Sequence, residues 1–249
     1  MKLTVLGSAA SYPGAGRACA GHLVRADGAT VLFDCGNGVV SNLGHTIMPS
    51  ELDALFVTHA HIDHFADIYA LHSALRFAVD GPCPPLKLYL PLGLFEVMAT
   101  LFTSQGAADF VQAFEPHPLA HGVPVHVGGL KVTPMLVDHI DPTFALVAGD
   151  GDARLCYTAD TRSGDAVHAA ARESSLLLAE ATLPPEMVNR ARHMTAAEAA
   201  CMARDAGAAR LVLTHIWPTI DRSEAADLAS EAFGGIVLVA NEMDEFHID

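Results

Sequence analysis

Cysteine is scarce in this chain and is never closely paired. The five cysteines among 249 residues stand far apart and form no CxxC motif, which excludes a disulfide framework and a thiolate zinc site. We therefore expect reduced thiols and a cytoplasmic protein. The apolar opening ends at Gly7, too early for a secretory signal. No run approaches the ~18 apolar residues of a membrane span, so no membrane partner is expected.

Basic residues are the second deficit. The chain has 14 Lys and Arg against 29 Asp and Glu, a formal net charge of −15. Proteins that follow a nucleic-acid backbone present a basic surface, so long nucleic acid is not expected as a partner. Hydrophobic residues make up 51% of the chain, which is enough for a core and excludes disorder. No linker divides the chain, and we expect a single domain over residues 1–249.

Hydrophobic patterning predicts strands early in the chain and helices between and after them. Strands are expected at residues 2–6, 22–26, 30–34, 54–58, 86–90, 123–127, 131–137, 144–148 and 153–158. Helices are expected at residues 64–79 (with Ile68, Leu71, Leu75 and Val79 on one face), 195–206 and 223–233. Apolar runs at 54–57, 176–179, 211–213 and 236–240 predict strands buried on both faces. Such strands need helices outside the sheet, which indicates a layered α/β fold.

One short segment combines four side chains that commonly bind metals. His59, His61, Asp63 and His64 form an HxHxDH pattern directly after a predicted buried strand and before a predicted helix. In an extended segment His59 and His61 project to the same side, and Asp63 and His64 lie at the turn into the helix. Imidazole and carboxylate are the ligands that zinc and neighbouring metals take when thiolate is absent. A solvated polar turn is the alternative interpretation.

Three further residues stand at the ends of predicted strands. They are His139, Asp160 and His215. Two cations ~3.5–4 Å apart need more donors than one motif supplies, and strand ends in α/β folds hold ligand-binding loops. The three residues are therefore candidates to complete a binuclear site. The other histidines, including His22 and His72, are expected to be surface residues or hydrogen-bonded structural ones.

Several blocks, in this order along the chain, resemble the metallo-β-lactamase fold superfamily. They are Leu6-Gly7-Ser8, the loop at 13–17, Phe33-Asp34-Cys35-Gly36, HxHxDH at 59–64, Val137-Asp138-His139, and the segments 157–161, 180–182, 193–199 and 213–215. The resemblance spans nearly the whole chain and is to the branch that contains ribonuclease Z and cyclic-nucleotide phosphodiesterases. It implies a four-layer αββα sandwich, and a homodimer is expected from the ribonuclease branch.

The resemblance also implies a ligand set. His59, His61 and His139 would hold one metal ion, Asp63, His64 and His215 would hold the other, and Asp160 would bridge the two. Asp34 resembles a residue that supports the metal-binding loop from behind. We expect two divalent ions, with zinc as the first candidate and manganese, iron or cobalt as alternatives, because His and Asp donors suit all four.

The reaction expected from this site is hydrolysis of a phosphodiester. Asp63 is the candidate group that orients the attacking water or accepts its proton, and His193, steered by Glu180, is the candidate acid for the leaving alkoxide. A helix-preceding structural residue is the alternative interpretation of His193. Ser8 is a weaker candidate, which could lend its N–H and hydroxyl to a phosphate; a simple turn explains that loop equally well.

Two departures from the ribonuclease pattern favour a small substrate. Ala179 stands where the ribonuclease has a histidine, and only residues 140–159 separate His139 from Asp160, which leaves no room for a tRNA-gripping arm. We therefore predict a phosphodiesterase for cyclic nucleotides or small phosphodiesters. The alternatives are a tRNA 3′-processing endonuclease and a thioester, lactone or β-lactam hydrolase of the same fold. An iron redox member would have an acidic residue at His61, and a non-catalytic binding module would lack ligands.

Overall fold

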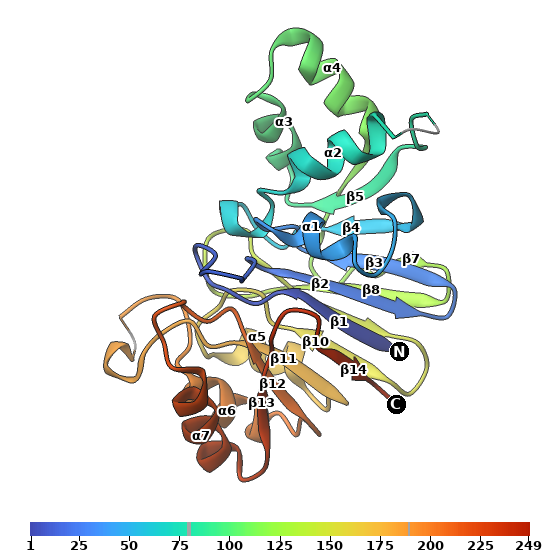
Figure 1. Ribbon diagram of the computed structural model, residues 1–249. Coiled ribbons are helices and arrows are strands. Elements are labelled where there is room, and N and C mark those ends of the chain that lie inside the picture. The colour runs from blue at the N-terminus through green and yellow to red at the C-terminus, as the bar shows by residue number, and fades with distance from the viewer. Residues whose placement is uncertain (79–80, 189) are drawn as a thin grey trace.

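The computed structural model describes residues 1–78, 81–188 and 190–249. Two seven-stranded sheets pack face to face, and helices cover the outer side of each sheet (Figure 1). This arrangement is the four-layer αββα sandwich expected from the resemblance. The prediction of one domain over the whole chain stays a prediction. Among the described residues, no helix has the length and apolar character needed to cross a bilayer.

The first sheet has the order β14-β1-β2-β3-β4-β5-β6. Strands β1 to β3 are antiparallel, β3 to β6 are parallel, and β14 from the end of the chain pairs antiparallel with β1. The strands are β1 (Lys2–Gly7), β2 (Gly21–Ala26), β3 (Ala29–Phe33), β4 (Ala54–Phe56), β5 (Leu86–Leu90), β6 (Phe114–Pro118) and β14 (Glu245–His247).

The second sheet has the order β13-β12-β11-β10-β9-β8-β7. Strands β7 to β10 are antiparallel, and β10 to β13 are parallel. The strands are β7 (Val125–Val127), β8 (Leu130–Leu136), β9 (Phe144–Gly149), β10 (Arg154–Tyr157), β11 (Leu176–Glu180), β12 (Leu211–Thr214) and β13 (Val237–Val239). Parallel strands direct their carboxyl ends to one edge of a sheet, where loops can hold functional groups.

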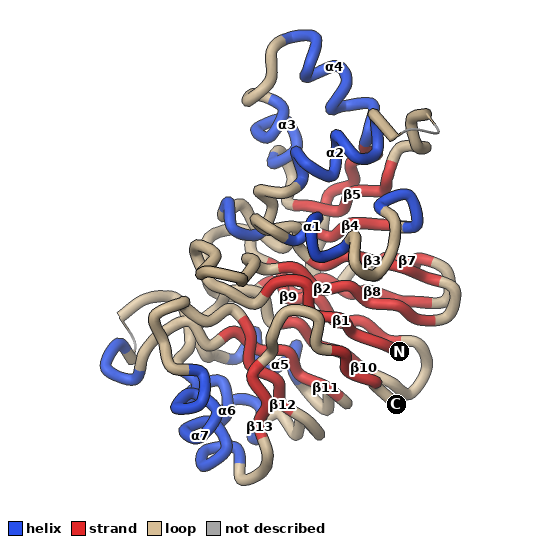
Figure 2. The backbone as a smooth tube through the Cα atoms, in the orientation of Figure 1, coloured by secondary structure: helices blue, strands red, loops and turns tan. Residues whose placement is uncertain are grey.

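Helices form the two outer layers, as Figure 2 shows. The first sheet is covered by α1 (Val39–Leu43), α2 (Ile68–Arg76), α3 (Leu94–Ala99) and α4 (Ser104–Ala113), and the second by α5 (Asp165–Ala171), α6 (Ala196–Asp205) and α7 (Arg222–Phe233). Short 3-10 turns are η1 (Pro49–Glu51), η2 (Ile62–His64) and η3 (Pro185–Met187). Helix α6 begins with the Thr195 and Glu198 capping box, in which each side chain accepts a backbone hydrogen bond from the other residue.

The apolar residues separate into three clusters that follow the layers. The central cluster lies between the two sheets and contains Phe33, Phe56 and Tyr157. The other two lie between each sheet and its own helices, as the buried apolar runs predicted. The runs at 54–57, 176–179 and 211–213 are buried throughout. Both faces of these central strands are therefore covered.

Two expectations about individual elements are wrong in part. The helix expected from residue 64 begins at Ile68, because residues 62–64 turn into η2. Ile68, Leu71 and Leu75 are buried as expected, whereas Val79 lies outside the described residues. The run at 236–240 is not buried on both faces: β13 is an edge strand, and Ile236 and Leu238 are 85% and 50% exposed.

The sequence contains no pattern that predicts some of the elements. Strand β6 has the sequence Phe-Glu-Pro-His-Pro, and its two prolines argue against a central strand. The structure tolerates them because β6 lies at the edge of its sheet. Helices α1, α3 and α5 have only five to seven residues, too few to establish a helical period.

Candidate metal centre

A single buried carboxylate holds the HxHxDH segment in place. Asp34, at the end of β3, accepts hydrogen bonds from Thr58 N (2.8 Å), Thr58 Oγ1 (3.0 Å), Tyr157 Oη (2.9 Å) and His64 Nδ1 (2.7 Å). Because His64 donates through Nδ1, its Nε2 lone pair is free to face the centre. The supporting role expected of Asp34 is confirmed, whereas sequence reasoning gave no role to Tyr157.

The other candidate donors come from the second sheet. His139 follows β8, Asp160 follows β10 and His215 follows β12, as expected from the strand ends. All three are buried. Residues far apart in the chain thereby meet the HxHxDH segment, since their donor atoms lie close to those of the segment.

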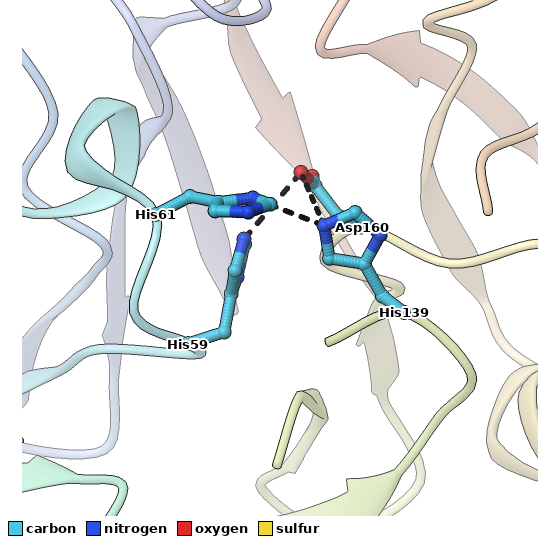
Figure 3. Close-up of side chains that lie close together, drawn as sticks. All are labelled: His59, His61, His139 and Asp160. Atoms are coloured by element: carbon cyan, nitrogen blue, oxygen red, sulfur yellow. Dashed lines mark hydrogen bonds and ion pairs between the residues drawn. The ribbon is translucent and has the colours of Figure 1, made fainter. Parts of the chain in front are cut away.

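The first group of donors combines three histidines with Asp160. The donor atoms of His59, His61, His139 and Asp160 all lie within 4.8 Å of one another (Figure 3). His139 Nε2 lies 3.0 Å from His61 Nδ1, and Asp160 Oδ2 lies 3.5 Å from His59 Nε2. This is the same set that the resemblance assigns to the first metal ion.

The second group consists of Asp63, His64 and His215, whose donor atoms also lie within 4.8 Å of one another. His215 Nε2 lies 3.1 Å from His64 Nε2 and 3.2 Å from Asp63 Oδ2. Asp160 Oδ1 lies 3.3 Å from His64 Nε2, so this carboxylate reaches both groups. Its position matches the bridge that the resemblance implies.

The donor atoms suit a divalent metal site. His59 Nε2 and Asp160 Oδ1 are buried and have no hydrogen-bond partner among the residues that the structure describes, although buried polar atoms are rarely left unpaired. Burial by itself would raise the pKa of Asp160, but the charges of His215 and His64 hold it well below its usual range. A bound cation would take the place of these imidazolium charges, with the ionised carboxylate and the deprotonated imidazole rings as its ligands.

A second layer of contacts orients the imidazole rings. His59 Nδ1 lies 3.0 Å from Thr58 Oγ1, His215 Nδ1 lies 2.9 Å from Thr182 Oγ1, and His139 Nδ1 donates to the Arg192 carbonyl at 2.9 Å. Such contacts fix the ring orientation and the tautomer of metal-binding histidines. Sequence reasoning missed Thr182 and Arg192, because each depends on a contact with a distant segment.

His193 and Glu180 form a pair beside the two groups. His193 Nδ1 donates to Glu180 Oε1 at 2.9 Å, and the His193 ring centre lies 4.6 Å from that of His139. Burial would lower the pKa of His193, but the hydrogen bond and charge of Glu180 outweigh it and raise the pKa to about 9. Glu180 is itself held by the backbone N–H groups of Thr161, Thr182 and Met194.

The residue that departs from the ribonuclease pattern does not point to this pair. Ala179 is fully buried and packs in the apolar cluster between the second sheet and its helices, together with Ala199 and Leu213. Successive residues of a strand point to opposite faces, so Glu180 and Ala179 lie on different sides of β11. The absence of a histidine at position 179 therefore leaves the candidate site intact.

The structure excludes one open alternative, that of Ser8, and contradicts one expectation, that of His22. Ser8 is fully buried, and its N and Oγ both donate to Glu242 Oε1 (3.2 and 3.0 Å), so they are not available to a phosphate. Ser11 of the same loop, which sequence reasoning missed, instead donates its N–H to Asp63 Oδ2 at 2.7 Å. His22 is buried, and neither of its ring nitrogens has a hydrogen-bond partner in residues 1–78, 81–188 and 190–249. Its ring packs against Tyr157, and burial lowers its pKa to about 3.

Comparison with known proteins shows the family. The model of the beta-lactamase superfamily domain matches residues 29–216, so the chain belongs to this superfamily. Membership and the His/Asp cluster together identify a metallo-hydrolase of the metallo-β-lactamase fold.

Three relatives cover nearly the whole chain. The metallo-beta-lactamase fold protein YhfI from Bacillus subtilis has a similar solved structure, with a TM-score of 0.88, 27% identity and 99% of each chain covered. The chain is 30% identical to the uncharacterized protein Rv1339 of Mycobacterium tuberculosis, over 95% of this chain and 88% of the relative. It is 29% identical to ribonuclease Z of Myxococcus xanthus, over 96% and 95% of the two chains.

Proposed function

We propose that this protein is a binuclear metal-dependent phosphodiesterase that acts on cyclic nucleotides or small phosphodiesters. The observation that supports this most directly is the arrangement of two donor groups that share Asp160, with the His193 and Glu180 pair beside them. Two neighbouring donor groups that would each hold a cation, with an acid beside them, are parts that catalyse displacement at phosphorus.

The chain would hold the two ions, zinc foremost, with the ligand sets described above and with Asp160 between them. The bound ions would lower the pKa of water and neutralise phosphoryl oxygens. Burial would raise the pKa of Asp63, but the hydrogen bond from His215 and the charge of His64 lower it, so this carboxylate stays ionised. Asp63 can therefore accept a hydrogen bond from the attacking water and orient it.

His193 supplies the proton for the leaving group in this proposal. Its Nδ1 is engaged by Glu180, which leaves Nε2 to donate to the departing alkoxide oxygen. The raised pKa keeps the ring protonated at neutral pH, as a general acid requires. Glu180 acts through His193 by fixing its orientation and its charge, and it is therefore a positioning residue.

The alternative substrate is precursor tRNA, because a relative is named ribonuclease Z. The net charge of −15 argues against it, since binding to a nucleic-acid backbone is dominated by basic side chains. A thioester releases a thiolate, which departs without protonation, so the His193 and Glu180 pair favours the phosphodiester over a thioester. A lactone or a β-lactam releases an alkoxide or an amine, which needs a proton, so the pair does not distinguish these substrates from the phosphodiester.

Metal content and hydrolysis, measured on one preparation, test the proposal. We expect two metal ions per chain by inductively coupled plasma mass spectrometry, and turnover of bis-p-nitrophenyl phosphate and 3′,5′-cyclic AMP with zinc or manganese. Precursor tRNA and a thioester serve as comparison substrates under the same conditions. Two ions with turnover of the thioester alone would overturn the proposal in favour of carbonyl chemistry, and cleavage of precursor tRNA alone would favour the ribonuclease.

A further inference from the structure

A cavity of about 540 Å³ has no part in the chemistry described above, and contacts through Ser11 and Thr182 link its lining to the candidate metal centre. It lies between the first turns of α6 and α7 and the segment that follows β11. Its volume is in the range of pockets that bind small organic ligands. The residues that line it include Leu183, Val188, Ala197, Trp217, Ile220 and Leu228.

Two chains of contacts connect this cavity to the metal centre. The indole Nε1 of Trp217 donates to Ser11 Oγ at 3.1 Å, and Ser11 N donates to Asp63 Oδ2 at 2.7 Å. On the other side, Thr182 lies between two residues of the cavity wall, Ala181 and Leu183, and contacts His215. The wall of the cavity is therefore two hydrogen bonds from one candidate ligand and one contact from another.

The lining is apolar with an acidic rim. Most of it consists of aliphatic side chains, proline and the half-buried Trp217 indole. Glu186, Asp221 and Glu224 supply carboxylates, and no lysine or arginine lines the cavity among the residues that the structure describes. Asp221 is engaged at the start of α7, where Oδ1 accepts from Ser223 N and Glu224 N. Glu186 and Glu224 are exposed and available as acceptors.

The apolar lining and the acidic rim together favour a nucleobase over other parts of a substrate. A second phosphate would be repelled by the carboxylates, and a small alkyl group would leave most of the cavity unfilled. A nucleobase is uncharged, has two flat apolar faces that stack on an indole, and has N–H donors at its edge that suit carboxylate acceptors. Stacking of this kind tolerates different bases, because every base has a π face.

We infer that this cavity is the nucleobase site, with Trp217 as the stacking surface, for a nucleotide whose phosphodiester lies at the metal centre. The inference rests on the proposed function and deepens it, since it restricts the substrate to a nucleotide with one phosphodiester near the site. A longer RNA would bring further phosphates close to the acidic rim.

The first test uses Trp217, which is the single tryptophan of the chain. We expect adenosine, which has no phosphate, to quench the tryptophan fluorescence saturably in metal-loaded protein and in protein treated with a chelator. Ribose 5-phosphate, which has no base, is the control and should leave the fluorescence unchanged. No saturable quenching by adenosine, or equal quenching by both compounds, would overturn the inference.

The second test separates base recognition from hydrolysis. In Trp217→Ala we expect kcat/KM for 3′,5′-cyclic AMP, relative to that for methyl p-nitrophenyl phosphate, to fall about tenfold or more, because alanine removes the stacking surface. Trp217→Phe should restore most of this ratio. An unchanged ratio in Trp217→Ala would contradict the inference.

A blocking variant gives an independent measurement. Ala197 lines the cavity on α6, so Ala197→Leu should raise KM for 3′,5′-cyclic AMP with little change in kcat. Ala226 lies on α7 outside the lining, and Ala226→Leu is the matched control with unchanged KM.

If no phosphodiester is hydrolysed but adenosine quenches Trp217, the proposed function fails while the base site stands. If cyclic AMP is hydrolysed and both variants behave alike, the base site fails.

Discussion

The two sheets contribute to the candidate centre in different ways. The first sheet supplies four donors on one six-residue segment, His59 to His64, which a single carboxylate, Asp34, holds through His64 and Thr58. The second sheet supplies three donors from the ends of three separate strands. We call the donors from the first sheet the first wall of the centre and the donors from the second sheet its second wall. The first wall depends on the hydrogen bonds of Asp34, which we call the clamp. The second wall depends on the relative positions of β8, β10 and β12. Substitutions in the two walls should have different consequences.

Asp160 is the residue at which the two walls meet, and its loss should have the largest effect. Asp160→Ala removes the one carboxylate that reaches both donor groups, so we expect metal content to fall well below two ions per chain and phosphodiester hydrolysis to fall below detection. Mass spectrometry of the purified variant measures the metal. Metal content equal to that of the unmodified protein would contradict the bridging assignment.

Asp34 tests the clamp of the first wall. Asp34→Asn keeps the shape but removes the charge that receives His64 Nδ1–H, so metal affinity should fall about 10- to 100-fold, as for other supporting residues around metal sites. Competition with a chromophoric chelator measures the affinity. Asp53→Asn is the matched control: Asp53 is an exposed carboxylate that accepts from Thr30 N at 2.8 Å, just before β4. Equal affinities for the two variants would mean that Asp34 does not act as a clamp.

His193 stands outside both donor walls and should separate metal binding from turnover. For His193→Ala we expect kcat to fall about 10²- to 10⁴-fold, the usual contribution of a general acid, with two ions retained. The loss should be smaller for a substrate with a p-nitrophenolate leaving group, which departs without protonation. A simultaneous loss of metal would show that His193 is a ligand, as the group formed by Asp160, His193 and His215 allows.

The difference between the two walls also explains what could be predicted from the sequence. The donors of the first wall lie within six consecutive residues, so the sequence alone shows their pattern. His139, Asp160 and His215 became candidates only as strand ends and through the family resemblance, because a lone histidine or aspartate has no distinguishing neighbour. Trp217 and Ser11 are 206 positions apart, and no local pattern indicates their contact.

Errors in the fold have a similar physical cause. The run at 236–240 has the same apolar composition as the buried strands, but β13 lies at the edge of its sheet, where the neighbouring layers leave Ile236 and Leu238 exposed. Composition does not show the position of a strand in its sheet. Ser8 resembled a phosphate-binding loop residue because its partner, Glu242, lies at the other end of the chain. The sequence pattern predicts strands correctly where they lie in the centre of a sheet. It gives the wrong result where burial or a hydrogen bond depends on a segment far away in the chain.

The helices that cover the two sheets can be compared through their N-terminal caps. Substitutions there should have the smallest effect, a change in the free energy of unfolding. Thr195 caps α6 with both arms of a capping box: Thr195 Oγ1 accepts from Glu198 N at 3.2 Å, and Glu198 Oε2 accepts from Thr195 N at 2.8 Å. Thr103 caps α4 with one long contact, 3.4 Å from Gly106 N. Thr195→Ala should therefore lower the free energy of unfolding by about 1 kcal/mol, and Thr103→Ala by clearly less. Urea denaturation measures both changes. Equal m-values, the slopes of the free energy of unfolding against urea concentration, would show that the folded and unfolded states of the two variants are otherwise unaltered. A larger loss for Thr103→Ala would mean that the layer on the first sheet, and not the one on the second, depends more on its helix caps.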